Sequence, residues 1–143
     1  MKLSKIARPV TWFAPEALGN RALPADGQLR VEIEPLSVPE LNRLRAPMIQ
    51  RMTDGDVSAA QMGQELRDAI ITARVRSVRG LEVDDASVTT GAGLVEAVSN
   101  ANDAEAGEIL DQIYSAITKA SVLREGAVGN CRRLGGCCAR RAA

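Results

Sequence analysis

The chain of 143 residues contains no histidine, and tryptophan, tyrosine and phenylalanine occur once each. Without an imidazole, Ser-His-Asp and Cys-His nucleophile pairs and histidine-ligated metal centres are excluded. Aromatic side chains bury the most area of any residue type. Because the chain has only three of them, its core has to be built from Leu, Ile, Val, Met and Ala. The scarcity of aromatic anchors also favours weak or transient contacts with partners.

Cysteine is scarce as well and is confined to one end of the chain. Cys131, Cys137 and Cys138 all lie in the last 13 residues, which argues against a disulfide framework that holds the fold together. Three thiols, two of them adjacent, also fall short of the four-ligand set of a structural zinc site. We therefore expect no bound metal, no cofactor and no catalytic residue, and hence no enzyme activity.

Long apolar runs and a net charge are also missing. No segment reaches the roughly 18 to 20 apolar residues of a membrane span, and residues 1–13 lack the apolar run of a secretory signal, so we expect a cytosolic protein. Lys plus Arg and Asp plus Glu number 18 each, and the pI is about 6.3. This balance argues against a protein dedicated to neutralising nucleic-acid phosphates.

The N-terminal part predicts a strand pair. Residues 1–28 hold three of the six prolines and two of the three aromatics, and we interpret them as an arm that carries a first strand at 10–13. Leu29, Val31 and Ile33 alternate with charged residues, which is typical of a half-buried strand. The two segments are expected to pair antiparallel.

Helices are predicted to follow. Ser37 and Glu40 have the spacing of a capping box at the start of the first helix, and Pro47 predicts a kink or break near Arg45 and Ala46. A second helix, capped by Asp56 or Ser58, is expected to continue toward Val78. Its predicted inward face consists of Met62, Leu66, Ala69, Ile70 and Ala73, and its predicted outward face includes Arg67 and Arg74.

Two more helices complete the prediction. Thr89 or Thr90 can cap a short helix, and Asn102 with Glu105 repeats the capping spacing before the strongest helical signal in the chain. That signal consists of apolar residues at three- and four-residue steps: Ile109, Leu110, Ile113, Ala116, Ile117 and Ala120. Between the two helical pairs, residues 80–91 are expected to be extended, with a turn at Asp84 and Asp85.

These elements predict a mainly α fold: a small helical domain of about four helices with an N-terminal two-stranded antiparallel β element and a flexible C-terminal tail. The expected divisions are the arm at 1–28, the strand plus helical domain at 29–123, and a flexible basic Cys/Arg tail at 124–143. Five arginines against one glutamate give that tail a charge of +4. A run of arginines without interleaved aromatics is usually solvated or docks an acidic protein surface.

Other motifs in the chain favour structural roles. The acidic pairs at Asp54/Asp56 and Asp84/Asp85 lie in predicted turns, where carboxylates satisfy local amides. The Gly-Ala-Gly stretch at 91–93 lacks the lysine and spacing of a phosphate-binding loop. We interpret it as the start of a helix rich in small residues.

Taken together, three segments resemble one known family. They are IEPLS at 33–37, GLEVDD at 80–85, and a helix that continues into KASVLREGAVGN at 119–130. This combination is similar to the small tail assembly chaperones of long-tailed bacteriophages. The resemblance implies a location in the host bacterial cytoplasm and binding to the tape measure protein during tail assembly, with the tail tube protein as a further candidate partner. It also implies that the unusual end at 131–143 could mark a ribosomal frameshift site, the alternative being an ordinary disordered tail.

Candidate partner-binding residues are Ile113, Ile117, Arg132 and Arg133. For the two isoleucines the alternative is a place in the core. Weak self-association is also expected, whereas a membrane and nucleic acid are not expected as partners. Two other functions stay open: a structural virion protein, for head-to-tail joining or decoration, and a small nucleic-acid-binding regulator that uses the arginine-rich tail.

Overall fold

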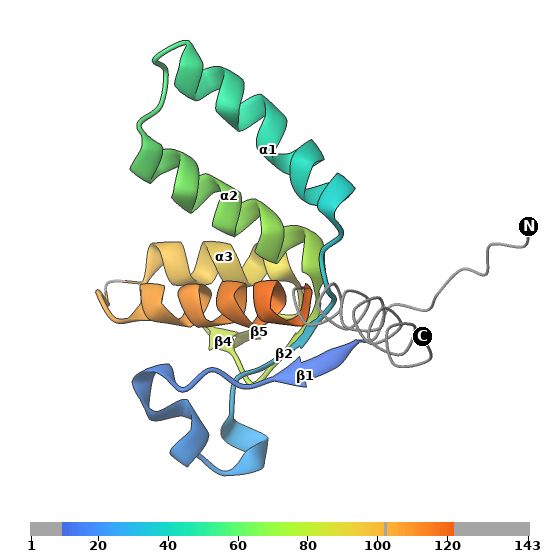
Figure 1. The fold of residues 1–143 in the computed structure, drawn as a ribbon. Coiled ribbons are helices and arrows are strands. Elements are labelled where there is room, and N and C mark those ends of the chain that lie inside the picture. The colour runs from blue at the N-terminus through green and yellow to red at the C-terminus, as the bar shows by residue number, and fades with distance from the viewer. Residues whose placement is uncertain (1–9, 102, 122–143) are drawn as a thin grey trace, which may run out of the picture.

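A computed structural model describes residues 10–101 and 103–121 of the chain (Figure 1). It contains a three-stranded antiparallel sheet in the order β1-β2-β3, a separate two-stranded hairpin, and long helices, so the mainly α prediction is confirmed. The strands and short 3-10 turns are β1 (Thr11–Phe13), η1 (Ala17–Ala22), η2 (Ala25–Gly27), β2 (Arg30–Ile33), β3 (Val75–Arg79), β4 (Glu82–Val83) and β5 (Ala86–Ser87). The helices are α1 (Val38–Thr53), α2 (Ala59–Arg74), α3 (Gly91–Asn100) and a further helix over residues 106–121.

The predicted strand pair is present and has a third member. β1 pairs with β2 antiparallel, with Trp12 opposite Glu32 and Phe13 opposite Val31. The second helix was expected to run toward Val78, but it ends at Arg74 and the chain continues directly as β3. The reason is tertiary: β2 offers an unpaired edge.

The switch from helix to strand is fixed at the first contact between β2 and β3. The Glu34 amide donates to the carbonyl of Arg74 at 3.0 Å, and a bulge between Glu32 and Ile33 shifts the register so that Val75 and Val78 both face the core. Because this spacing is not the strict alternation of a regular strand, the sequence pattern alone did not reveal β3.

The helix starts follow the predicted capping chemistry. The Ser37 hydroxyl accepts from the Glu40 amide while the Glu40 carboxylate accepts from the Ser37 amide, and Pro39 lies in the first turn. Ser58 forms the corresponding box with Gln61, and the Thr90 hydroxyl accepts from the amide of Gly93. Of the kink or break predicted near Arg45 and Ala46, the break is wrong, because α1 continues through Pro47 to Thr53. One proline removes a single intrahelical hydrogen bond, which the rest of the helix compensates.

The faces of α2 differ in part from the prediction. Leu66 and Ile70 are buried as expected, but Ile71 is also fully buried and Ala73 is exposed. Arg67 was placed outside, yet it is half-buried and donates to Asp111 on the 106–121 helix at 2.8 Å. Burial acts to lower the pKa of Arg67, but its hydrogen bonds to Asp111 and Asp68 and the charges of both carboxylates outweigh it, so the pKa is raised.

The 106–121 helix confirms the strongest sequence signal. Its apolar stripe closes the core, with Leu110, Ile113 and Ile117 almost completely inaccessible. The prediction of a cap at Asn102 lies outside the described residues; the Asp103 carboxylate accepts from the amide of Glu105 just before this helix. The core therefore lies between the inner face of the sheet and the helices α2, α3 and 106–121, with Val31, Ile33, Ile70 and Leu94 as further members.

The described part of the N-terminal arm is anchored to this core. Asn20 is buried and its side chain makes three hydrogen bonds: it donates to the carbonyls of Pro15 and Leu29 and accepts from the Leu29 amide. The Gln112 side chain oxygen accepts from the amides of Glu16 and Ala17 at 2.7 and 3.1 Å. Residues 14–28 are thus held against the 106–121 helix.

The predicted turn at Asp84 and Asp85 is present as the two-residue loop of the β4–β5 hairpin. Both aspartates have positive φ, as a type I′ turn requires. The predicted tail at 124–143 lies outside the described residues. Within residues 10–101 and 103–121, none of the helices has the length and apolarity needed to cross a bilayer.

Candidate partner-binding surface

The predicted partner-binding residues fall into two groups. Ile113 and Ile117 have 0% exposure and belong to the core, so the alternative assignment is the one the structure supports. Neither side chain is accessible to a partner while the chain is folded. Arg132 and Arg133 lie outside the described residues. A binding surface has to be sought among exposed side chains of other elements.

Helix α1 carries three of the exposed large apolar side chains of the described residues. Not one of its 16 residues is buried. Leu41, Leu44 and Met48 are half-buried and pack against the core cluster, but Val38, Ile49 and Met52 are 50%, 42% and 38% exposed. Figure 1 shows why: α1 lies at the outside of the molecule, with α2 between it and the remaining helices. Most of one face of α1 is therefore uncovered.

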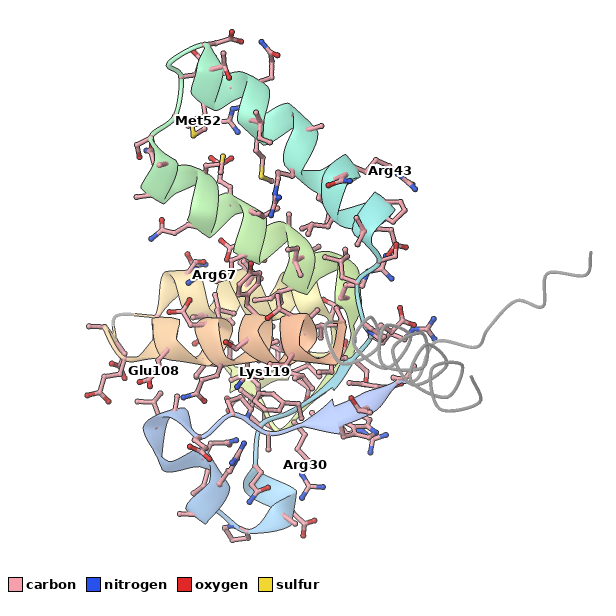
Figure 2. All side chains as sticks on the ribbon, viewed as in Figure 1. Arg30, Arg43, Met52, Arg67, Glu108 and Lys119 are labelled. Atoms are coloured by element: carbon pink, nitrogen blue, oxygen red, sulfur yellow. The ribbon has the colours of Figure 1, made fainter. Side chains whose placement is uncertain are left out.

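The exposed apolar residues of α1 share a face with one cation. Val38, Arg45, Ile49 and Met52 follow one another at steps of seven, four and three residues, which places them along one side of the helix. Arg45 is exposed, and so is Arg43, which Figure 2 shows on the side of α1 away from α2. Within the described residues, neither arginine has a hydrogen bond or an ion pair. The surface is thus apolar with free positive charge.

Helix α1 is attached at its two ends by charged contacts. Near the turn to α2, Arg51 binds the Glu65 carboxylate, with the closer nitrogen–oxygen distance at 2.6 Å. At its start, Glu40 binds Arg74 at 2.5 Å. Between these ends, α1 contacts chiefly α2. This attachment leaves the outward face of α1 in solvent.

The contact at the start of α1 belongs to a largely buried charge cluster. The Glu34 side chain is only 8% exposed and binds the guanidinium groups of Arg74 and Arg76. Arg74, itself 12% exposed, lies between the carboxylates of Glu34 and Glu40. Its Nε is buried without a hydrogen-bond partner in the described structure. The cluster joins the ends of β2 and α2 to the start of α1, and it accounts for the burial of Arg74, which the sequence placed outside.

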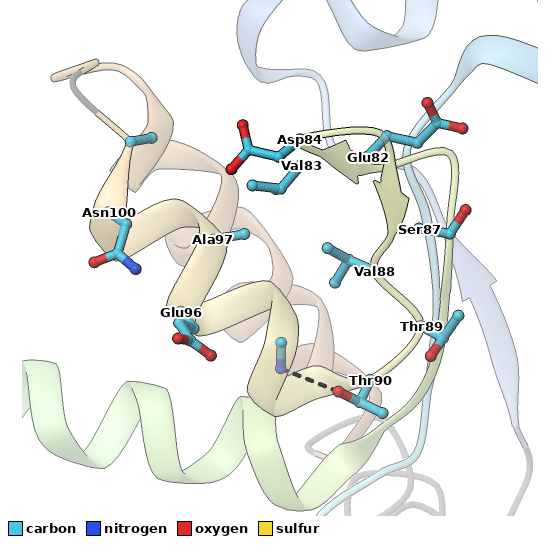
Figure 3. A pocket seen from close by; sticks show the side chains of 12 residues that line it. Glu82, Val83, Asp84, Ser87, Val88, Thr89, Thr90, Glu96, Ala97 and Asn100 are labelled. Carbon is cyan, nitrogen blue, oxygen red and sulfur yellow. Dashed lines mark hydrogen bonds between the residues drawn. The ribbon is translucent and has the colours of Figure 1, made fainter.

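A second candidate site is an open groove of about 770 Å³ between the β4–β5 hairpin and α3 (Figure 3). Asp84 reaches toward α3 from the hairpin and Glu96 stands on the opposite wall, while Glu82 points away from the groove. The Thr90 hydroxyl is already engaged with the amide of Gly93. In the part of the chain that the structure describes, no set of three or more Cys, Asp or Glu side chains is arranged to hold a metal ion.

Sequence reasoning identified the apolar stripe of α1 but assigned no partner role to it. The stripe of Leu41, Leu44, Met48 and Met52 has the spacing of a core-facing helix. A signal that could have identified the surface is given by Val38 and Ile49, which lie beside this stripe and widen the apolar face beyond what one neighbouring helix can cover. No known protein family, curated protein or solved structure matches this chain.

Proposed function

We propose that this chain is a non-enzymatic tail assembly chaperone of a long-tailed bacteriophage, and that it covers apolar segments of the tape measure protein through helix α1. The supporting observation is that α1 buries none of its residues and exposes Val38, Ile49 and Met52 on one face. An amphipathic helix that lays its apolar face against such a surface is a common mode of recognition. The family resemblance of the sequence supplies the identity of the partner.

The charge of α1 specifies the kind of helix that fits. Arg45 lies within the apolar face, Arg43 lies on another side of α1, and neither has an acidic partner among the described residues. A bound helix with carboxylates beside its apolar stripe would pair with Arg45, and a helix with cations in that place would be rejected. Since no aromatic residue anchors this surface, each contact is expected to be weak, and many copies along a long partner would act through effective concentration.

The test is co-expression with a helical fragment of a tape measure protein. The chain is expected to keep the fragment soluble, and the double variant Val38→Asp/Ile49→Asp is expected to lose this effect, because both side chains are exposed and their replacement leaves the core intact. The matched control is Leu23→Asp, since Leu23 is 48% exposed but lies outside α1. Retained solubility with the double variant, or equal loss with the control, would contradict the proposal.

The alternative function, a structural virion protein, differs from a chaperone in what is expected of the finished particle. A chaperone that acts only during assembly is expected to be absent from purified mature particles, as measured by quantitative mass spectrometry. Detection of the chain in a fixed stoichiometric amount would reject the chaperone function in favour of a head-to-tail joining or decoration role.

A further inference from the structure

The outer face of the three-stranded sheet gathers arginines around the sole tryptophan. Val31 and Ile33 face the core, so Arg30 and Glu32 of β2 face outward. Trp12 lies opposite Glu32 and Arg79 lies opposite Arg30, and residues directly opposite in an antiparallel ladder share a face. This set of Trp12, Arg30, Glu32 and Arg79 is called the sheet platform below. Nothing in the fold described above requires a basic sheet platform.

Two observations indicate that the sheet platform is built for an anion. Arg30 and Arg79 form a direct cross-strand pair of like charges, which is a destabilising arrangement in a sheet. Among the described residues, neither has a carboxylate within ion-pair distance; Arg30 donates only to the Gln28 side chain. Glu32 is half-buried and accepts from the Ser77 hydroxyl. An anionic group between the two guanidinium groups would relieve their repulsion.

The tryptophan of the sheet platform is in contact with one of the two arginines. Trp12 is 45% exposed, and the guanidinium carbon of Arg79 lies 4.8 Å from the centroid of its ring. The indole and the guanidinium therefore form a stacked pair that is open to solvent. Single-stranded nucleic acids are bound by this combination of an aromatic surface for a base and arginines for the phosphates. The Arg-rich tail has no aromatic residue of its own, whereas the sheet platform supplies one.

We propose that the sheet platform binds single-stranded nucleic acid, with a base stacked against Trp12 and Arg79 and a phosphate held between Arg30 and Arg79. A single strand is favoured over a duplex because the platform is short and offers one stacking ring. It is favoured over an acidic peptide because carboxylates gain nothing from the exposed indole. The sheet platform lies on β1, β2 and β3, away from the apolar face of α1, so this activity is independent of the proposed chaperone function.

The sole tryptophan makes the test direct. A thymidine oligonucleotide of about 12 nucleotides is titrated into the full chain at about 20 and about 200 mM salt while tryptophan fluorescence is recorded. Quenching is expected, because the base stacks on Trp12. The double variant Arg30→Gln/Arg79→Gln is expected to weaken the quenching strongly and to lower the slope of log affinity against log salt by about 0.7, the value for one phosphate contact with a single strand.

The matched control is Arg43→Gln/Arg45→Gln, which removes the same charge from α1. It is expected to leave the quenching unchanged, and far-UV circular dichroism verifies that both double variants are folded. Trp12→Leu, followed by anisotropy of a labelled oligonucleotide, is expected to weaken binding about fivefold or more, since stacking of one base contributes roughly 1 to 3 kcal/mol. Unchanged quenching in the Arg30→Gln/Arg79→Gln variant, or equally strong quenching by polyglutamate, would overturn the proposal.

Discussion

At the scale of single residues, the glycines show how closely the chain packs. Gly91 begins α3 where that helix meets the last turns of α2, and a Cβ there would lie 2.7 Å from the carbonyl oxygen of Ile71 and 3.1 Å from the Val75 Cβ. Gly63, in the second turn of α2, has open space around the same position. Two helical glycines in one chain thus have opposite packing environments.

The substitution Gly91→Ala is expected to destabilise the fold by about 1 to 3 kcal/mol, because the neighbouring atom is backbone and has to move. Gly63→Ala is expected to stabilise it by about 0.5 to 1 kcal/mol, since alanine lowers the entropy of the unfolded chain without a clash. Urea unfolding of both variants measures the two free energies. Equal effects of the two substitutions would show that α2 and α3 are not in close contact at Gly91.

At the scale of elements, local rules predicted helices well and tertiary rules decided the exceptions. The capping box at Ser37 lies within one turn of chain, so the sequence alone was enough to find it, and for α2 it narrowed the cap to Asp56 or Ser58, of which the structure has Ser58. β3 depends on pairing with β2, which lies more than 40 residues earlier, and no local pattern carries that information. The burial of Arg67 and Arg74 likewise depends on carboxylates from distant segments.

The candidate surface was missed for a related reason. The spacing of Leu41, Leu44 and Met48 indicates an apolar face, but spacing cannot say whether another element covers that face. The same limit applies to Ile113 and Ile117, whose spacing fits a core helix and a binding helix equally well. Only the arrangement of α1 outside α2 separates a covered stripe from an exposed one.

The exposed position of α1 predicts that it opens more easily than the rest of the fold. Its residues are not buried, and Pro47 leaves the carbonyl of Arg43 without its helical donor. Hydrogen exchange is expected to be faster for the α1 amides than for those of 106–121. Pro47→Ala is expected to slow exchange in α1 by raising its opening free energy by about 3 kcal/mol, while exchange in 106–121 stays unchanged. Equal protection of both helices before the substitution would contradict this view.

At the scale of the whole molecule, the net charge is zero, but basic and acidic residues are unevenly distributed along the sequence. Residues 1–9 and 122–143 carry eight of the 18 Lys and Arg residues but only one of the 18 Asp and Glu residues. The described residues therefore hold a clear excess of acid, and Asp84 and Glu96 concentrate part of it along one groove. Zero net charge combined with such segregation favours attraction between copies.

Self-association is accordingly expected at low salt and not at high salt. Sedimentation velocity at about 20 and about 300 mM salt measures it, because the higher concentration screens charges beyond several ångström. Deletion of residues 124–143, which removes a charge of +4, is expected to abolish the low-salt species. Association that persists in high salt, or in the deletion variant, would point to apolar contacts instead.

The hydrogen bonds that Gln112 and Ser121 accept from residues near the other end of the chain also bear on how the protein is made. Ser121 accepts from the amide of Leu36, and Gln112 accepts from the amides of Glu16 and Ala17. On the ribosome, the 106–121 helix is missing from the core around β2 until Ile117 has been synthesised. At roughly 5 to 20 residues per second, that interval lasts about 4 to 17 s. The newly made chain therefore keeps part of the apolar side of β2 exposed for seconds before the 106–121 helix is complete.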